Sequence, residues 1–188
     1  MSVDAVSTFL AVGALLVTAL VAVTWALALV ARLGGPTGPI ESIRLTIAGQ
    51  GVRLAWVMAL IATLGSLYFS EVAHFIPCEL CWYQRIAMYP LALILGIAAW
   101  RGDRAIRRYV IPVAAVGGVI SVYHYLIQHF PDLAAGGTCD IGIPCSAAWV
   151  WKFGFVSIPF MAMASFAAII TLLALDRGRD ATREDART

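Results

Sequence analysis

The amino-acid sequence predicts an all-α fold: a polytopic membrane protein built as a bundle of five transmembrane helices. Of its 188 residues, 61% are hydrophobic and only 13% are charged, whereas a soluble domain carries about 25% charged residues. The hydrophobic residues gather into nearly uncharged blocks, each long enough to cross the roughly 30 Å of hydrocarbon in a bilayer. A soluble helical protein is excluded because so short a chain could not bury five such blocks.

The predicted helices follow one another along the chain. They occupy residues 5–31, 54–75, 82–100, 109–128 and 155–175. The first and last blocks are uncharged, and the second has Glu71 and His74 near its end. The third contains one charge, Arg85, and the fourth has His124 as its only titratable group besides tyrosines. As a helix, each block satisfies its own backbone hydrogen bonds, which the bilayer interior demands.

The first block is interpreted as a retained helix and not as a secretory signal peptide. A signal peptide has a basic segment before a short apolar core. Here the acidic Asp4 precedes the block, Arg32 follows it, and the block is too long for a signal core. We therefore expect this helix to stay in the mature protein.

The basic residues predict the orientation in the membrane. Every lysine and arginine except Arg85 and Lys152 lies in residues 32–53, 101–108 or 176–188. The positive-inside rule places such segments in the cytoplasm. The N-terminus is therefore expected outside and the C-terminus inside. The connection 32–53, rich in glycine and proline, is expected to be flexible or to lie at the membrane surface.

All four cysteines fall on the predicted outer side, where thiols can persist as disulfides. Cys78 and Cys81 form a C-x-x-C motif, where Pro77 is expected to end the second helix and the third helix begins. Residues three apart in a helical turn share a face, with Cα atoms about 5 Å apart, a span that a disulfide can bridge. A helix N-terminus also stabilises a thiolate, the form that reacts in disulfide exchange.

Arg85 lies on the same predicted helical stripe as the two cysteines, four residues after Cys81. A charge at this depth needs a partner or a route to the headgroups. One interpretation is an arginine that extends to the interface. Its alignment with the cysteines favours a second one, in which it stabilises a thiolate or donates hydrogen bonds to a bound electron acceptor.

The second pair, Cys139 and Cys145, follows Gly136-Gly137 in the connection before the last helix. Its turn residues predict a short, exposed loop that can meet a soluble partner. The aromatic residues after it, Trp149 among them, are typical of an interfacial belt and less of a substrate site.

Other interpretations of the cysteines were weighed. Trp82 stands where c-type haem attachment needs a histidine, which excludes that cofactor. A structural zinc site is disfavoured by the five-residue gap in the second pair and by the oxidising compartment. Two purely structural disulfides remain the main alternative, and they would leave the position of Arg85 unexplained.

At these residues the sequence resembles the DsbB/BdbC family of membrane thiol:quinone oxidoreductases. The matching motifs are Cys-Glu-Leu-Cys-Trp-Tyr-Gln-Arg-Ile-Ala-Met-Tyr-Pro at 78–90, the pair Cys139 and Cys145, and Phe-Gly-Phe-Val-Ser-Ile-Pro-Phe at 153–160. The resemblance covers about residues 53–175 and implies a four-helix redox core there.

The ends of the chain depart from the family pattern. Residues 1–52 add one extra N-terminal transmembrane helix and a cytoplasmic loop, and residues 176–188 form a tail that is expected to be disordered. The resemblance leaves open whether the extra helix packs on the core, covers a groove or contacts a partner.

The resemblance also implies an activity in a bacterial cell membrane. A DsbA-like, extracytoplasmic thioredoxin-fold protein would be oxidised, and a quinone, ubiquinone or menaquinone, would be the cofactor. Four catalytic cysteines are implied: Cys78, Cys81, Cys139 and Cys145. By analogy Cys139 forms the mixed disulfide with the partner, exchange reduces the Cys78–Cys81 pair, and Cys81 stands beside the quinone. Arg85 and His124 are the candidate quinone-binding residues; no metal and no nucleic acid are expected.

Two alternatives to this activity were considered. In a VKOR-like quinone reductase the C-x-x-C motif comes late in the chain. Here the motif precedes the second cysteine pair, which disfavours that alternative. A non-catalytic membrane scaffold or transport subunit with two structural disulfides is the alternative from another class of protein.

Overall fold

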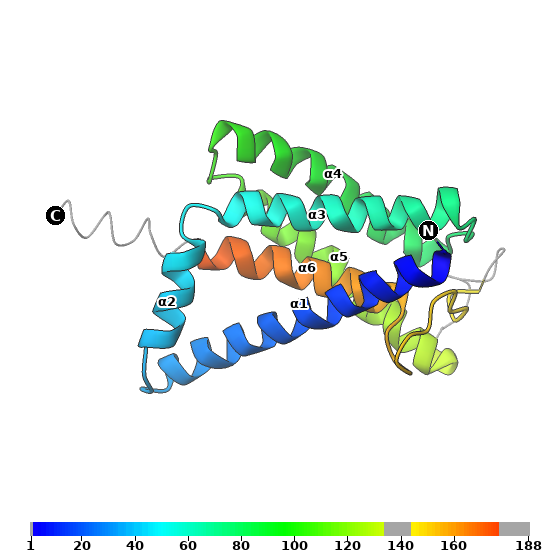
Figure 1. Cartoon of the computed structure of the whole chain (residues 1–188), viewed down its shortest axis with the longest axis horizontal. Coiled ribbons are helices and arrows are strands. Elements are labelled where there is room, and N and C mark those ends of the chain that lie inside the picture. Colours follow the sequence, from blue (N-terminus) through cyan, green and yellow to red (C-terminus); the bar gives the residue numbers. More distant parts are fainter. Residues whose placement is uncertain (1, 134–143, 177–188) are drawn as a thin grey trace.

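The apolar blocks of the sequence fold as five long helices in the computed structural model, which describes residues 2–133 and 144–176 (Figure 1). The helices are α1 (Val3–Arg32), α3 (Gly51–Leu67), α4 (Glu79–Arg101), α5 (Arg107–His129) and α6 (Ile158–Leu175). With α3 extended by the π-helical turn η1 (Tyr68–Val72), each is long and apolar enough to cross a membrane. The prediction of an all-α helical membrane bundle is confirmed; in the described residues the only β pairing is an isolated bridge between Lys152 and Val156.

The connection after the first long helix contains a helix that the sequence interpretation missed. Helix α2 (Gly38–Ile47) begins with Pro39 in its first turn, where the missing N–H of proline costs nothing. The glycine–proline pattern predicts a segment that is flexible or lies at the membrane surface, whereas in the structure it marks the start of a helix. In Figure 1, α2 links the far end of α1 to the start of α3.

Two predicted helix ends were wrong. The second transmembrane segment ends at Val72 and not at residue 75, because the chain turns at His74, whose φ is 54°. The last helix begins at Ile158 and not at residue 155. Before it, Phe153 and Gly154 have positive φ values and form a turn closed by the bridge between Lys152 and Val156.

The main apolar core lies between α3, α4, α5 and α6. It is assembled from alanine, leucine and valine side chains, with the fully buried ring of Phe166 among them. Gly117 of α5 lies directly against this ring, since a Cβ built at Gly117 would be 2.4 Å from Phe166 Cζ. The absence of a side chain at Gly117 therefore lets α5 and α6 pack closely at this point.

Helix α1 lies on the outside of this four-helix core, along α6. It buries only Ser7, Ala11 and Ala14. Two polar contacts attach it: Asp4 pairs with Lys152, and Trp25 Nε1 donates to Thr171 Oγ1 at 2.9 Å.

The two ends of the bundle carry different residues. Figure 1 shows the N-terminus, the start of α4 and the segment 144–157 at one end, and α2 with the end of α6 at the other. The tail predicted at 176–188 is described only at Asp176, which is buried and accepts a hydrogen bond from Gly49 N at 2.8 Å. The rest of that predicted tail lies outside the described residues.

Candidate functional site

The C-x-x-C motif lies at the first turn of α4, as predicted. Cys78 is the N-cap residue, with an extended backbone, and Cys81 follows in the first turn. Their sulfur atoms are 2.8 Å apart, and Cys81 N donates to Cys78 Sγ at 3.4 Å. Both cysteines are free thiols. The two sulfur atoms are therefore close enough to be joined in a disulfide.

The surroundings of Cys78 favour its thiolate. A hydrogen bond from the Cys81 thiol lowers the pKa of Cys78 well below the usual range of a thiol, and His124 and the Cys81 backbone N–H act in the same direction. Burial opposes them, since a charge loses solvation in the interior. The hydrogen bonds outweigh burial, so Cys78 is the nucleophilic sulfur of the pair when reduced.

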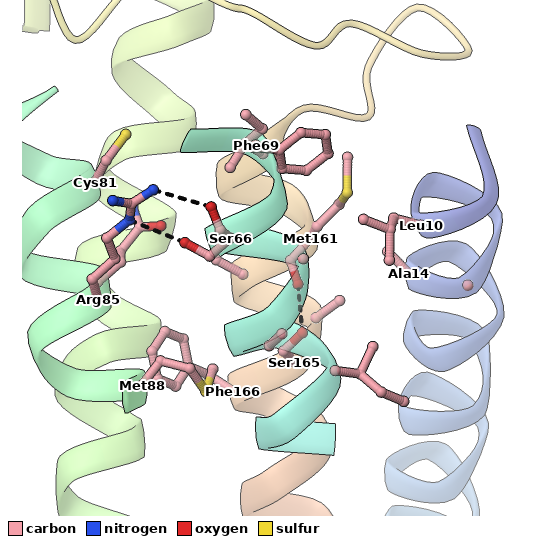
Figure 2. Close-up of a pocket in the computed structure, with 18 of the residues that line it drawn as sticks. Leu10, Ala14, Ser66, Phe69, Cys81, Arg85, Met88, Met161, Ser165 and Phe166 are labelled. Carbon is pink, nitrogen blue, oxygen red and sulfur yellow. Dashed lines mark hydrogen bonds between the residues drawn. The ribbon is translucent and has the colours of Figure 1, made fainter. Parts of the chain in front are cut away.

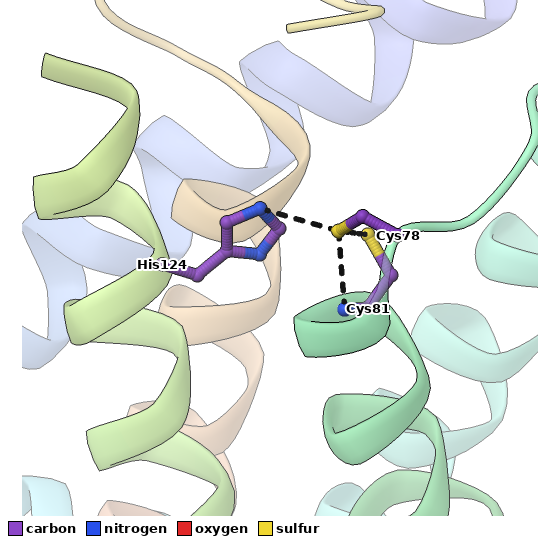
Figure 3. A group of neighbouring side chains, drawn as sticks. All are labelled: Cys78, Cys81 and His124. Carbon is purple, nitrogen blue, oxygen red and sulfur yellow. Dashed lines mark hydrogen bonds between the residues drawn. The ribbon is translucent and has the colours of Figure 1, made fainter. Parts of the chain in front are cut away.

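His124 of α5 approaches the thiol pair from the neighbouring helix (Figure 3). Its Nε2 lies 3.6 Å from Cys78 Sγ and 3.2 Å from the carbonyl oxygen of Cys145. On the other side of the ring, Gln84 Nε2 lies 2.9 Å from Nδ1. Because an amide nitrogen only donates, Nδ1 accepts and the ring proton of neutral His124 sits on Nε2. That proton points to Cys78 and the Cys145 carbonyl.

Gln84 was not singled out from the sequence, although an amide in a predicted transmembrane helix, three positions after Cys81, is a usable signal. It is buried, and its only described hydrogen bond is to His124. The buried amide holds the imidazole in one tautomer and one orientation, which is how a histidine at a reactive sulfur is commonly positioned.

The side chain of Cys145 is buried, whereas the sequence predicts an exposed loop for the segment 139–145, of which residues 139–143 lie outside the described part. Its side chain is 1% exposed and packs with Cys78, Leu80 and Ile127 in one buried cluster. Cys145 is disulfide-bonded, and Cys139 lies outside the described residues. The sequence interpretation failed because turn residues around a cysteine indicate a loop but not which way its side chain points.

Arg85 is held by α3. Its Nε donates to Ser66 Oγ at 3.0 Å, and a terminal nitrogen donates to the Ser66 carbonyl at 3.1 Å. The guanidinium also lies 5.3 Å from the centre of the Trp82 ring, a cation–π arrangement. A guanidinium has five N–H donors, so the contacts with Ser66 leave donors for another group.

A cavity of about 280 Å³ extends from Arg85 into the bundle. Cys81, Gln84, Arg85, Ser66 and Tyr89 form its polar part. Apolar residues of α1, α3 and α6 line the remainder (Figure 2). An apolar cavity with a few convergent polar groups is the usual form of a small-molecule site.

The two predicted quinone-binding residues lie in different surroundings in the structure. Arg85 borders the large cavity, whereas His124 does not and instead contacts Cys78. The sequence placed both near the same end of the bundle, but the faces of α4 and α5 on which they lie decide what each one meets.

Trp149 belongs to the cavity and not only to an interfacial belt, which corrects the sequence interpretation. Its ring stacks on Phe75, which stacks in turn on Phe69, with centroid distances of 5.3 and 5.8 Å. Its Nε1 donates to the Ile76 carbonyl at 3.2 Å. All three rings line the cavity, so the segment after Cys145 helps to close the cavity near Cys81.

The ligand atoms of Cys78, Cys81 and His124 lie within 4.8 Å of one another and form a group that could hold a metal ion. A closed structural zinc site takes four ligands, and the group found among the described residues has three. The same three side chains also explain a thiolate in a C-x-x-C pair, so their proximity alone does not indicate a metal.

Comparison with known proteins identifies the family of this chain. Residues 50–175 match the family described as disulfide bond formation protein DsbB. The chain belongs to the DsbB family. It is 54% identical over 124 residues to disulfide bond formation protein C of Bacillus subtilis, covering 66% of this chain and 90% of that protein.

Two other relatives have similar names. A probable disulfide formation protein of Oceanobacillus iheyensis is 46% identical over 68% of this chain and 91% of its own length. One from Coxiella burnetii is 45% identical over 70% and 93%. No solved structure matches the chain. The DsbB match begins at residue 50, so α1 and α2 lie outside it.

Proposed function

We propose that this DsbB-family protein is a membrane thiol:quinone oxidoreductase that reoxidises a DsbA-like thioredoxin-fold partner. One observation carries the proposal: only one residue of the C-x-x-C pair reaches the apolar cavity. Cys78 belongs to a buried cluster with Cys145, against which Cys81 also packs, and of the two only Cys81 borders the apolar cavity beside Arg85. This arrangement connects a thiol-exchange side to an acceptor side through a single disulfide.

The exchange side begins with a disulfide between Cys139 and Cys145. A thiolate of the partner attacks Cys139, the S–S bond breaks, and Cys145 leaves as a thiolate. Cys145 then attacks Cys78, which breaks the Cys78–Cys81 bond and releases Cys81 as a thiolate. The second partner thiol then attacks the mixed disulfide, which closes the partner's own disulfide and releases Cys139 as a thiolate. Cys139 attacks Cys145, which restores the Cys139–Cys145 bond, breaks the Cys145–Cys78 bond and releases Cys78, so that Cys78 and Cys81 are both reduced. Two electrons and two protons have then moved from the partner to the C-x-x-C pair.

His124 serves this exchange from a fixed position. Its Nε2 proton lies toward Cys78 Sγ and the Cys145 carbonyl. It therefore stabilises negative charge on Cys78 whenever that sulfur leaves or attacks. Gln84 keeps the ring in the tautomer that carries this proton. His124 thus belongs to the exchange side in this proposal, and Arg85 to the acceptor side.

The residues around the cavity fit a quinone. The guanidinium of Arg85 has donors for a quinone oxygen, and Cys81 borders the same polar part of the cavity. The apolar remainder suits a hydrocarbon tail. A bound quinone would supply the acceptor for two electrons and two protons. Arg85 would hold its oxygen, and Trp149 with its stacked partners would exclude water near Cys81.

The proposed orientation puts the cysteine end outside the cytoplasm. Arg32 and Arg101 lie in the last turns of α1 and α4, at the end opposite the start of α4 where Cys78 lies. The positive-inside rule then directs the thiol pair to the oxidising compartment, where a disulfide-forming protein meets its substrates.

The test uses purified protein in lipid nanodiscs, a reduced thioredoxin-fold protein, and either ubiquinone or menaquinone, with quinol formation followed by absorbance. Each of the four Cys→Ser variants should lose turnover with the protein substrate. With a small dithiol that reaches Cys78–Cys81 directly, Cys145→Ser should retain quinone reduction while Cys81→Ser loses it. Unimpaired turnover in the Cys78→Ser or Cys81→Ser protein would end the mechanism.

The scaffold alternative predicts a different result in the same assay. A membrane subunit with structural disulfides would form no quinol with any acceptor, and its Cys81→Ser variant would differ from the wild type only in stability.

A further inference from the structure

Helix α1 supplies one wall of the cavity at the proposed acceptor site, although it lies outside the DsbB match. Five of the cavity-lining residues belong to it: Phe9, Leu10, Gly13, Ala14 and Val17. They recur at positions that share one helical face. The four-helix core by itself would lack this wall.

The α1 wall faces the polar part of the cavity from the other side of the bundle. Figure 2 shows Leu10 and Ala14 across from Arg85 and Cys81, with residues of α3 and α6 between them. The cavity therefore has a polar end at the C-x-x-C motif and an apolar end at α1. A ligand that fills it needs a polar head and a hydrocarbon part.

At Gly13, the cavity-lining face of α1 has no side chain. A Cβ added at Gly13 would meet nothing within 4 Å, although Gly13 lines the cavity. Nearby, Leu10 comes close to α3, since a Cβ at Gly65 would lie 3.2 Å from Leu10 Cδ1. Contact at Leu10 and open space at Gly13 together shape a passage along α1.

Contacts at several points along α1 hold this wall in place. Ala11 and Ala14 are buried against Phe160 and Ala164 of α6. The ion pair of Asp4 with Lys152 and the hydrogen bond of Trp25 with Thr171 hold α1 further along its length. The position of α1 is thus specified by contacts and is not an accident of an unattached helix.

We propose that α1 is the tail-binding wall of the acceptor site, and that Gly13 sets the room for the isoprenoid tail of the lipid-soluble acceptor. The inference rests on the proposed quinone-reductase function and deepens it. The headgroup is held at Arg85, and the tail lies along the cavity-lining face of α1 at Gly13. This protein therefore distinguishes acceptors by their tails through a helix that its DsbB-family match does not include.

The test compares a quinone that carries a long isoprenoid tail with the same headgroup without a tail. The variant Gly13→Leu extends a branched side chain into the passage, and Ala19→Leu, on the exposed face of α1, is the matched control. For Gly13→Leu, the ratio of the KM for the tailed quinone to the KM for the tail-less one should rise about tenfold, because small changes in apolar pockets discriminate by at least that much. Ala19→Leu should leave the ratio unchanged.

A second measurement does not depend on turnover. In a Cys81→Ser background, both quinones are titrated against the protein, and binding is followed by the quenching of tryptophan fluorescence, to which Trp149 in the cavity wall contributes. Gly13→Leu should raise the Kd ratio of tailed to tail-less quinone by the same factor. Equal ratios in the Gly13→Leu and Ala19→Leu proteins, or equal loss of both quinones in Gly13→Leu, would overturn the inference. Failure of the proposed function gives a different result, because the wild type would then reduce neither quinone.

Discussion

The contact between Gly117 and Phe166 gives a prediction that can be worked out from the structure. The change is Gly117→Ala, which adds one methyl group to α5 where it crosses α6. The new Cβ would lie 2.4 Å from Cζ and 2.5 Å from Cε1 of Phe166, whereas ordinary contact begins at 3.4 Å. The ring is fully buried, so the overlap must be relieved by movement of the ring or of a helix.

The neighbouring glycine provides the scale for this cost. A Cβ at Gly118 would lie 3.6 Å from Phe166 Cβ, which is ordinary contact. Both Gly→Ala changes gain the same helix propensity, about 0.8–1.0 kcal/mol. The difference between them therefore isolates the overlap. Inserting a methyl group into a filled core costs about 1–3 kcal/mol, so Gly117→Ala should be less stable than Gly118→Ala by that amount.

The assay is unfolding of both variants and the wild type in the same mixed micelles, followed by circular dichroism against the mole fraction of denaturing detergent. Phe166 also borders the cavity, so a ring displaced toward it would occupy space proposed for the acceptor. Gly117→Ala should therefore also bind quinone less tightly than Gly118→Ala. Equal stability and equal quinone affinity of the two alanine variants would refute the argument from packing.

Three further predictions concern the site. Arg85→Met should raise the KM for quinone roughly ten- to hundredfold, since a hydrogen bond to a charged group contributes about 1.5–3 kcal/mol; Arg44→Met, on the exposed face of α2, should not. Because the pKa of Cys78 is lowered, its alkylation in the reduced protein should stay fast well below pH 8 and slow only as pH falls through that lowered value. His124→Phe should move the midpoint to higher pH, as measured by mass spectrometry; an unchanged midpoint would remove His124 from the exchange step. Elemental analysis should find no stoichiometric zinc at Cys78, Cys81 and His124, and a chelator should leave turnover intact; metal-dependent turnover would contradict this assignment.

The sequence was sufficient for features that depend on local composition. The five membrane-spanning segments follow from uncharged blocks, because the bilayer demands long apolar helices whatever their neighbours are. The start of α4 at the C-x-x-C motif also follows locally, since Cys78 caps the helix. Helix α2 was missed because its short pattern of glycine and proline is typical of a loop as well as of a helix start.

What the sequence by itself determined is the membrane bundle, the thiol motif and Arg85 one turn beyond it. Only the tertiary structure decided what these groups meet. His124 lies 46 residues from Cys78, and no periodicity shows that it faces the thiol and not the cavity. Likewise, Gly13 lines the cavity only because α1 packs on α6 beside it. The reason is physical: hydropathy and capping act within a few residues, whereas the contacts of a site depend on which helical faces pack together.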